Sequence, residues 1–301
     1  MQSLWMLLAA LLFAVMGVCV KLAASRYAVA EIVFYRSLFG TVALGLFVRA
    51  RGLSLRTSLP WAHMRRGTVG TLSLAMWFYA TSMLPLATAI TLNYTSPLFV
   101  ACFSVAAALA LGRPLNVPLL ITIAIGFAGV SLVLQPSFGA GQWPGALIGL
   151  GSGLLSAVAY WHVRDLGRRG EPEWRTVFYF SLVGTVLGLA GTLLTGFSIH
   201  SGRGLLLLLG VGVSATLAQL AMTRAYGRGH ALLTANLQFS AIVFASILGA
   251  AVFDDRMPGG SWLGIVLIIG AAIAATALIA ARSRAAAPAA PTIPEGLPDR
   301  P

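Results

Sequence analysis

The chain has 301 residues and a net charge of +12, with 58% hydrophobic and only 9% charged side chains. Soluble domains carry about 25% charged residues, so this composition excludes an ordinary soluble protein, whose surface could not expose so many apolar side chains without associating. The positive charge does not indicate nucleic-acid binding, because the basic residues lie in short loops between apolar runs rather than on a soluble module.

Apolar runs of roughly 20 residues, the length that a helix needs to cross the hydrocarbon core of a bilayer, recur along the chain. The first run lacks a basic flank and is longer than a signal-peptide core, so we expect a retained helix. One hairpin is reduced to Leu84-Pro85-Leu86, and the Ala/Pro/Arg-rich tail is expected to be disordered. The predicted transmembrane helices are 3–24, 29–48, 67–84, 86–111, 116–135, 143–164, 175–197, 204–226, 230–253 and 261–281.

Basic residues are distributed unevenly between alternate loops. If the N-terminus is cytoplasmic, fifteen of them, including Arg65 and Arg66, lie at cytoplasmic ends and loops, against four on the opposite side, including Lys21 and Arg256. This is the positive-inside pattern. Both termini are therefore predicted to be cytoplasmic, which requires an even number of spans, and ten spans satisfy it.

The second half of the chain repeats the first. Residues 34–42, FYRSLFGTV, match residues 178–186, FYFSLVGTV, at an offset of 144. At an offset of 143, three residues of the first half match three of the second: Thr91, Asn93 and Arg113 match Thr234, Asn236 and Arg256. Five spans per half invert the second copy relative to the first, an architecture of many secondary transporters. We predict an all-α membrane protein with a first five-helix repeat over 1–137, an inverted repeat over 138–281 and a disordered cytoplasmic tail over 282–301.

Two segments resemble the drug/metabolite transporter superfamily in its ten-helix EamA branch, and the resemblance covers nearly all of residues 1–281. They are FYRSLFG at 34–40, and LPLATA at 84–89, which runs into NYTSPLF at 93–99. Family repeats usually end their fourth helix with Gly-Glu, whereas this chain has Gly112-Arg113 in one half and Asp254-Asp255-Arg256 in the other. The resemblance implies transport of small metabolites, such as amino acids, cofactors or xenobiotics.

Polar side chains inside a span are costly and are therefore candidates for a transport site. Arg36, whose insertion costs about 2.5–3.5 kcal/mol, either faces a wet cavity and attracts an anionic group such as a carboxylate, or ties helices together or snorkels outward. Its repeat partner is Phe180, so the scaffold does not require the charge. Glu31 is expected at an outer helix N-terminus, where Lys21 could pair with it, and proton coupling through Glu31 is the less favoured interpretation.

The duplicated Asn93 and Asn236 either bind substrate from symmetry-related positions or join helices. Pro97 removes a helical hydrogen bond and predicts a kink that either exposes carbonyl groups or serves packing. Tyr160 is interpreted as part of an interfacial belt, whereas Trp77 and Tyr79 lie deeper and would form an aromatic lining. With Pro97 as the gating kink, the predicted substrate-binding residues are Arg36, Trp77, Tyr79, Asn93, Tyr94, Thr95, Gln219, Asn236 and Gln238.

The sequence lacks a zinc-protease motif, a nucleophile elbow and a Walker loop, so we expect no enzyme, metal or cofactor. It predicts a secondary transporter of the bacterial inner membrane that moves a small organic metabolite, such as an amino acid or similar amphipathic zwitterion, by alternating access, with export favoured. The alternatives are an intramembrane enzyme such as a prenyltransferase-like protein, and uptake of a cofactor or nucleotide-like metabolite. Proton coupling is left open against facilitation or exchange. The expected partners are a small molecule and lipid, without nucleic acid, and monomer and homodimer both stay open.

Overall fold

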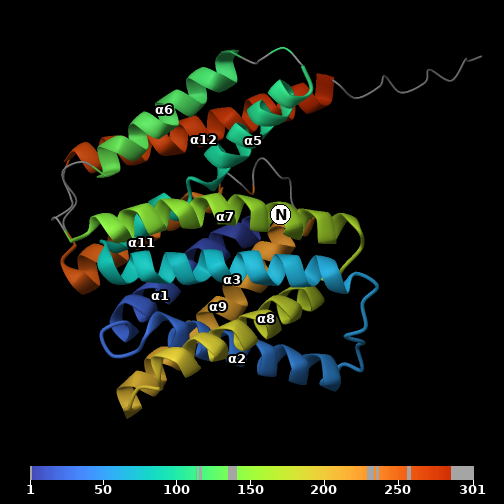
Figure 1. Ribbon diagram of the computed structural model, residues 1–301, viewed down its shortest axis with the longest axis vertical. Helices are drawn as coiled ribbons and strands as arrows, with labels where there is room; N and C mark the ends of the chain where they lie inside the picture. Colours follow the sequence, from blue (N-terminus) through green and yellow to red (C-terminus); the bar gives the residue numbers. More distant parts are fainter. Residues whose placement is uncertain are drawn as a thin grey trace, which may run out of the picture.

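The computed structural model describes residues 2–112, 114, 117–134, 141–228, 234, 237–255 and 259–285. Within these ranges every regular element is helical (Figure 1). After a 3-10 turn over Gln2–Leu4, the helices are α1 (Trp5–Ala23), α2 (Val29–Ala50), α3 (Pro60–Met83), α4 (Leu86–Asn93), α5 (Ser96–Ala110), α6 (Val117–Leu134), α7 (Trp143–Arg168), α8 (Glu173–Thr195), α9 (Gly202–Arg228), α11 (Ser240–Phe253) and α12 (Gly259–Ala285).

The lengths and compositions of these helices confirm the predicted all-α membrane fold. Seven segments are long and apolar enough to cross a membrane: α1, α2, the α4–α5 pair, α7, α8, α9 and α12. Two more apolar helices, α6 and α11, are shorter within the described residues. With α3, which has 24 residues, these segments are consistent with a transporter of about ten helices.

Three predicted spans differ from the structure in detail. The last one, α12, ends at Ala285 rather than at 281, so it includes the first four residues of the predicted tail. The third helix begins at Pro60 rather than at residue 67, because proline is well accommodated in the first turn and the helix extends through the basic residues that were assigned to a loop. The fourth span is divided into α4 and α5, with Tyr94 and Thr95 between them. Pro97 is the second residue of α5, and its missing N–H is tolerated in a first turn.

Helix packing follows the internal repeat. The extensive contacts pair α2 with α8 and α6 with α12, which are counterparts in the two halves. They also pair α1 with α9 and α3 with α7, and exchanging the two halves converts one of these pairs into the other. In Figure 1, α5, α6 and α12 lie together at the top of the bundle, and α2 and α8 lie at the opposite side. The packing therefore has the pattern expected of two copies related by a twofold axis.

The repeated FYxSLxGTV segments cross each other. Gly40 in α2 lies directly against Ser181 in α8, and the hydroxyl oxygens of Thr41 and Thr185 are 3.1 Å apart. Phe34, which comes earlier in α2, lies against Gly188, which comes later in α8. The two helices therefore run antiparallel at the crossing, the orientation expected when the second copy is inverted.

Candidate functional site

A cavity of about 70 Å³ lies between the two halves. Its first-half residues come from α1, α3, α4 and the α4–α5 break, and its second-half residues from α7, α8 and α9. The lining consists of Phe13, Arg66, Gly70, Ser73, Leu74, Trp77, Asn93, Tyr94, Ser156, Ala159, Tyr160, Phe180, Gln219 and Met222. Apolar and aromatic walls with a few converging polar groups are typical of small-molecule sites.

Asn93 joins three helices at the edge of this cavity. Its amide nitrogen donates to the Oγ atoms of Ser152 and Ser156 at 2.9 and 3.0 Å. Ser73 Oγ in turn lies 2.8 Å from Ser156 Oγ and donates to the carbonyl oxygen of Ser152 at 2.9 Å. Both amide hydrogens of Asn93 are thus used between α4 and α7. The hydrogen bonds that Asn93 forms with the described residues do not use its side-chain carbonyl oxygen.

The break between α4 and α5 packs closely on α7, and Gly153 permits this approach. A Cβ atom at position 153 would lie 2.6 Å from the carbonyl oxygen of Leu92 and 2.5 Å from Thr95 Oγ1. Only glycine lets the α7 backbone reach the break at this distance. The contact fixes the break beside the cavity, which Tyr94 then lines.

Two buried arginines lie against one aromatic ring. The guanidinium carbon of Arg66 is 4.2 Å from the centre of the Phe180 ring, and that of Arg36 is 4.9 Å from it. Arg66 is 3% exposed and Arg36 is 4% exposed. Neither side chain forms a hydrogen bond or an ion pair with any described residue, and Nε and Nη1 of Arg66 and Nε of Arg36 are buried donors without an acceptor.

The cavity gathers part of the predicted site. Four predicted residues line it: Trp77, Asn93, Tyr94 and Gln219. Arg36 lies against the lining residue Phe180. Like Arg36, three further predicted residues do not line the cavity: Tyr79, Thr95 and Gln238. Gln238 instead accepts a hydrogen bond from the hydroxyl of Tyr226 at 2.5 Å. Asn236 lies outside the described residues.

The positive-inside pattern assigns Arg66 to a cytoplasmic loop, but the structure buries this residue in the second turn of α3. The signal was present in the helical spacing of Arg66, Gly70, Ser73 and Trp77, which places all four on one face. Tyr160, interpreted as an interfacial residue, lines the cavity and stacks on Tyr226 with ring centres 5.7 Å apart.

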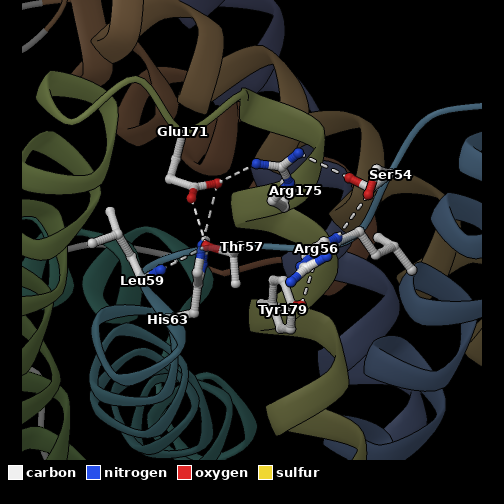
Figure 2. Close-up of polar contacts among 9 residues, drawn as sticks. Ser54, Arg56, Thr57, Leu59, His63, Glu171, Arg175 and Tyr179 are labelled. Atoms are coloured by element: carbon white, nitrogen blue, oxygen red, sulfur yellow. Dashed lines mark hydrogen bonds and ion pairs between the residues drawn. The ribbon is translucent and has the colours of Figure 1, made fainter.

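At one end of the bundle, residues of both halves meet in the Glu171 cluster, which we define as Ser54, Thr57, His63, Glu171, Arg175 and Tyr179 (Figure 2). The Glu171 carboxylate accepts hydrogen bonds from Thr57 Oγ1 at 2.6 Å and from Arg175 Nη1 at 3.0 Å. Arg175 also donates to the carbonyl oxygen of Ser54 at 2.8 Å. Burial on its own raises the pKa of Glu171, but these hydrogen bonds and the neighbouring positive charges hold the pKa below its ordinary value.

Other contacts join the halves at the N-terminus of α2 and beside α1. The buried Glu31 carboxylate accepts hydrogen bonds from the backbone N–H and the hydroxyl of Ser198. Lys21 pairs with Asp255 at 2.8 Å, and Asp255 accepts the backbone N–H of Leu86 at 3.0 Å. The predicted pairing of Lys21 with Glu31 is therefore wrong, because the α8–α9 loop covers Glu31 and the end of α11 brings Asp255 to α1.

The equivalent tyrosines of the two crossing helices, Tyr35 and Tyr179, each contact a loop of the other half. Tyr179 of α8 donates from its hydroxyl to the carbonyl oxygen of Leu55 in the α2–α3 loop at 2.8 Å. Tyr35, the repeat counterpart of Tyr179, packs edge-on against His200 in the α8–α9 loop, with ring centres 5.3 Å apart. The N-terminal part of each helix thus contacts a loop of the other half.

Comparison with known proteins identifies the architecture. Residues 1–135 and 143–277 each match the EamA-like transporter family. The chain is 33% identical over 269 residues to the pseudopaline exporter CntI of Pseudomonas aeruginosa, covering 89% of this chain and 93% of the relative. It is 29% identical to the riboflavin transporter of Rhizobium johnstonii, covering 90% and 89%.

The fold is also similar to that of a solved crystal structure. The TM-score is 0.65 at 24% sequence identity, over 94% of this chain and 98% of the other. Together with the two family matches, which each lie within one of the predicted repeats, these likenesses confirm the resemblance noted in the sequence. The chain belongs to the EamA-like transporter family of the drug/metabolite transporter superfamily.

Proposed function

We propose that this protein moves a small organic metabolite across the bacterial inner membrane by alternating access of two inverted halves, and that the central cavity binds the metabolite. The observation that carries the proposal is that both halves line one buried cavity that combines aromatic walls with polar groups such as the Asn93 carbonyl oxygen and Gln219. Secondary transporters with inverted repeats bind their substrates between the repeats.

The contacts at the ends of the bundle support alternating access. The Glu171 cluster and the Glu31–Ser198 contact each link one half of the chain to the other. Rocking one half against the other would break the links at one end and retain those at the other. By the positive-inside rule, the Glu171 cluster lies at the cytoplasmic end, and both termini are cytoplasmic.

The relatives differ from one another in both cargo and direction. The relative from Pseudomonas aeruginosa is named as an exporter, whereas another relative, 24% identical and from Rickettsia felis, is named as an S-adenosylmethionine uptake transporter. One scaffold therefore serves different cargoes and directions, so the lining of the cavity is where the substrate of this chain is selected.

Counterflow into proteoliposomes tests the proposal. Liposomes containing the purified protein are loaded with a metabolite mixture and screened for uptake of labelled metabolites from the same set. Trp77→Leu, inside the cavity, should reduce exchange at least tenfold. Trp161→Leu is the matched control, because Trp161 is 67% exposed on α7 and faces lipid in the proposed orientation of the bundle. The proposal fails if no metabolite exchanges, or if Trp77→Leu exchanges as fast as Trp161→Leu.

A further inference from the structure

We propose that the ligand of the central cavity is a small organic anion whose carboxylate binds beside Arg66, with Arg36 supplying a second positive charge. This inference rests on the proposed function, because it assigns the chemical class of the molecule that the cavity would bind. It also narrows the expected cargo from a zwitterion to a molecule with net negative charge.

The positive charges of Arg36 and Arg66 are not balanced by the described residues around them. Buried arginines are ordinarily paired with carboxylates, because an isolated buried charge is strongly disfavoured. Neither Arg36 nor Arg66 has such a partner among the described residues. Glu31, Glu171 and Asp255 each have other partners at the ends of the bundle. A bound anion would supply the missing negative charge.

Neighbouring residues hold the guanidinium of Arg66 in place without accepting hydrogen bonds from it. The guanidinium of Arg66 packs against Gly70, which lies one turn further along α3. A Cβ atom at position 70 would collide with Nη1 of Arg66, so glycine makes this position of the guanidinium possible. The guanidinium also lies over the Phe180 ring in a cation–π contact. A cation–π contact positions a guanidinium without using its N–H donors. Nε and Nη1 of Arg66 are therefore left for an acceptor at the wall of the cavity.

The remaining lining suits the organic part of such an anion. Trp77 and Tyr94 supply aromatic surface, and Gln219 and the Asn93 carbonyl oxygen supply polar groups. An ammonium group bound near Arg66 would instead meet two positive charges in a buried environment, where like charges repel strongly. The arrangement therefore selects for anions over cations of the same shape.

Three aromatic probes of similar size separate these charges: the anion benzoate, the neutral benzamide and the cation benzylammonium. Binding of each is measured from the melting temperature of the purified full chain in detergent. Benzoate should raise the melting temperature in a concentration-dependent way, whereas benzamide and benzylammonium should leave it unchanged. Equal stabilisation by benzamide would overturn the role of charge, and tighter binding of phenylphosphonate than of benzoate would overturn the assignment of a carboxylate.

Variants tie the effect to the site. Arg66→Gln should weaken benzoate binding at least tenfold, and Arg66→Lys should restore part of it. Arg51→Gln is the matched control, because Arg51 is an exposed arginine that lies over the Phe47 ring away from the cavity. Gly70→Ala provides a second test in case Arg66→Gln fails to fold. It keeps the charge of Arg66 but occupies the space of the guanidinium, so it should also weaken benzoate binding. Benzoate affinity at the wild-type level in both Arg66→Gln and Gly70→Ala would overturn the proposal.

Counterflow separates this inference from the proposed function. If a neutral or cationic metabolite exchanges and Arg66→Gln leaves its rate unchanged, the anion proposal fails while transport stands. If benzoate binds through Arg66 but no metabolite exchanges, the anion site stands and the transport proposal fails.

Discussion

The crossing of α2 and α8 gives the sharpest test of the packing between the halves. A Cβ atom at Gly184 would lie 2.5 Å from the Oγ of Ser37 and 3.1 Å from its Cβ. Normal contacts between such atoms begin near 3.5 Å, so Gly184→Ala must push the two helices apart or displace Ser37. Overpacking of this kind costs about 1–3 kcal/mol, and we expect Gly184→Ala to destabilise the protein by that amount.

Denaturation of the purified protein in mixed micelles, followed by circular dichroism, measures the change. Ser37→Gly removes the two nearest atoms that oppose the new methyl group and leaves Thr71 Oγ1 at 3.3 Å. Gly184→Ala with Ser37→Gly should therefore recover most of the loss, with a coupling energy of at least about 0.5 kcal/mol. Gly270→Ala in α12 is the control, because a Cβ atom there would have no neighbour within 4 Å. Alanine is favoured over glycine in a helix by up to about 1 kcal/mol, so this control should be neutral or slightly more stable.

Two results would refute the reasoning. Gly184→Ala could unfold at the same denaturant concentration as Gly270→Ala, or the losses of Gly184→Ala and Ser37→Gly could simply add. Either would mean that the helices are not in close contact at this point. The symmetry-related pair gives an independent repetition, because a Cβ atom at Gly40 would lie 2.6 Å from Ser181 Oγ.

Two further predictions concern the ends of the bundle. Glu171→Gln should destabilise the protein by about 1–3 kcal/mol at pH 7, because the carboxylate binds Thr57 and Arg175. Folding lowers the pKa of Glu171, so the stabilisation that its carboxylate provides is complete above the unfolded pKa of about 4.3 and is lost as the pH falls through the folded pKa. A difference in melting temperature between the wild type and Glu171→Gln that stays constant from pH 7 to pH 3 would contradict this. Asp255→Ala should lower the free energy of unfolding by a similar amount, because it leaves Lys21 without its partner. Adding Lys21→Met to this variant should restore part of the stability in the same denaturation assay. If Asp255→Ala destabilises the wild type and the Lys21→Met variant equally, the pairing is contradicted.

The fold was largely predictable because its signals are local. A membrane span needs about 20 apolar residues in a row, and hydropathy reveals such runs one at a time. The family resemblance was likewise carried by short segments such as 34–40, and it is confirmed by the family matches. The repeat of 34–42 at 178–186 could be read from the sequence, but the fact that these two segments contact each other could not.

The site was only partly predictable because its contacts join distant parts of the chain. Arg66 was hidden by a rule that assigns basic residues near span ends to loops, whereas α3 continues past that boundary. The partner of Lys21 is 234 residues away, and no local pattern identifies it. The sequence predicts that Asn93 either binds substrate or joins helices, but only the positions of Ser152 and Ser156 reveal which of its atoms join helices.

The twofold arrangement explains why Arg36 and Phe180 meet. Residues close to a symmetry axis contact their own counterparts, as the hydroxyls of Thr41 and Thr185 do. Positions 36 and 180 are also counterparts, and each lies five residues before that pair in its helix. A strictly symmetric chain would place two arginines or two phenylalanines together there. Two arginines would repel each other and two phenylalanines would carry no charge, whereas one of each supports a cation on a ring beside the cavity. The two copies thus differ at this position, and the difference places a positive charge where the helices contact each other. Arg36→Phe restores the symmetry, and we expect it to reduce benzoate binding while preserving the helix crossing.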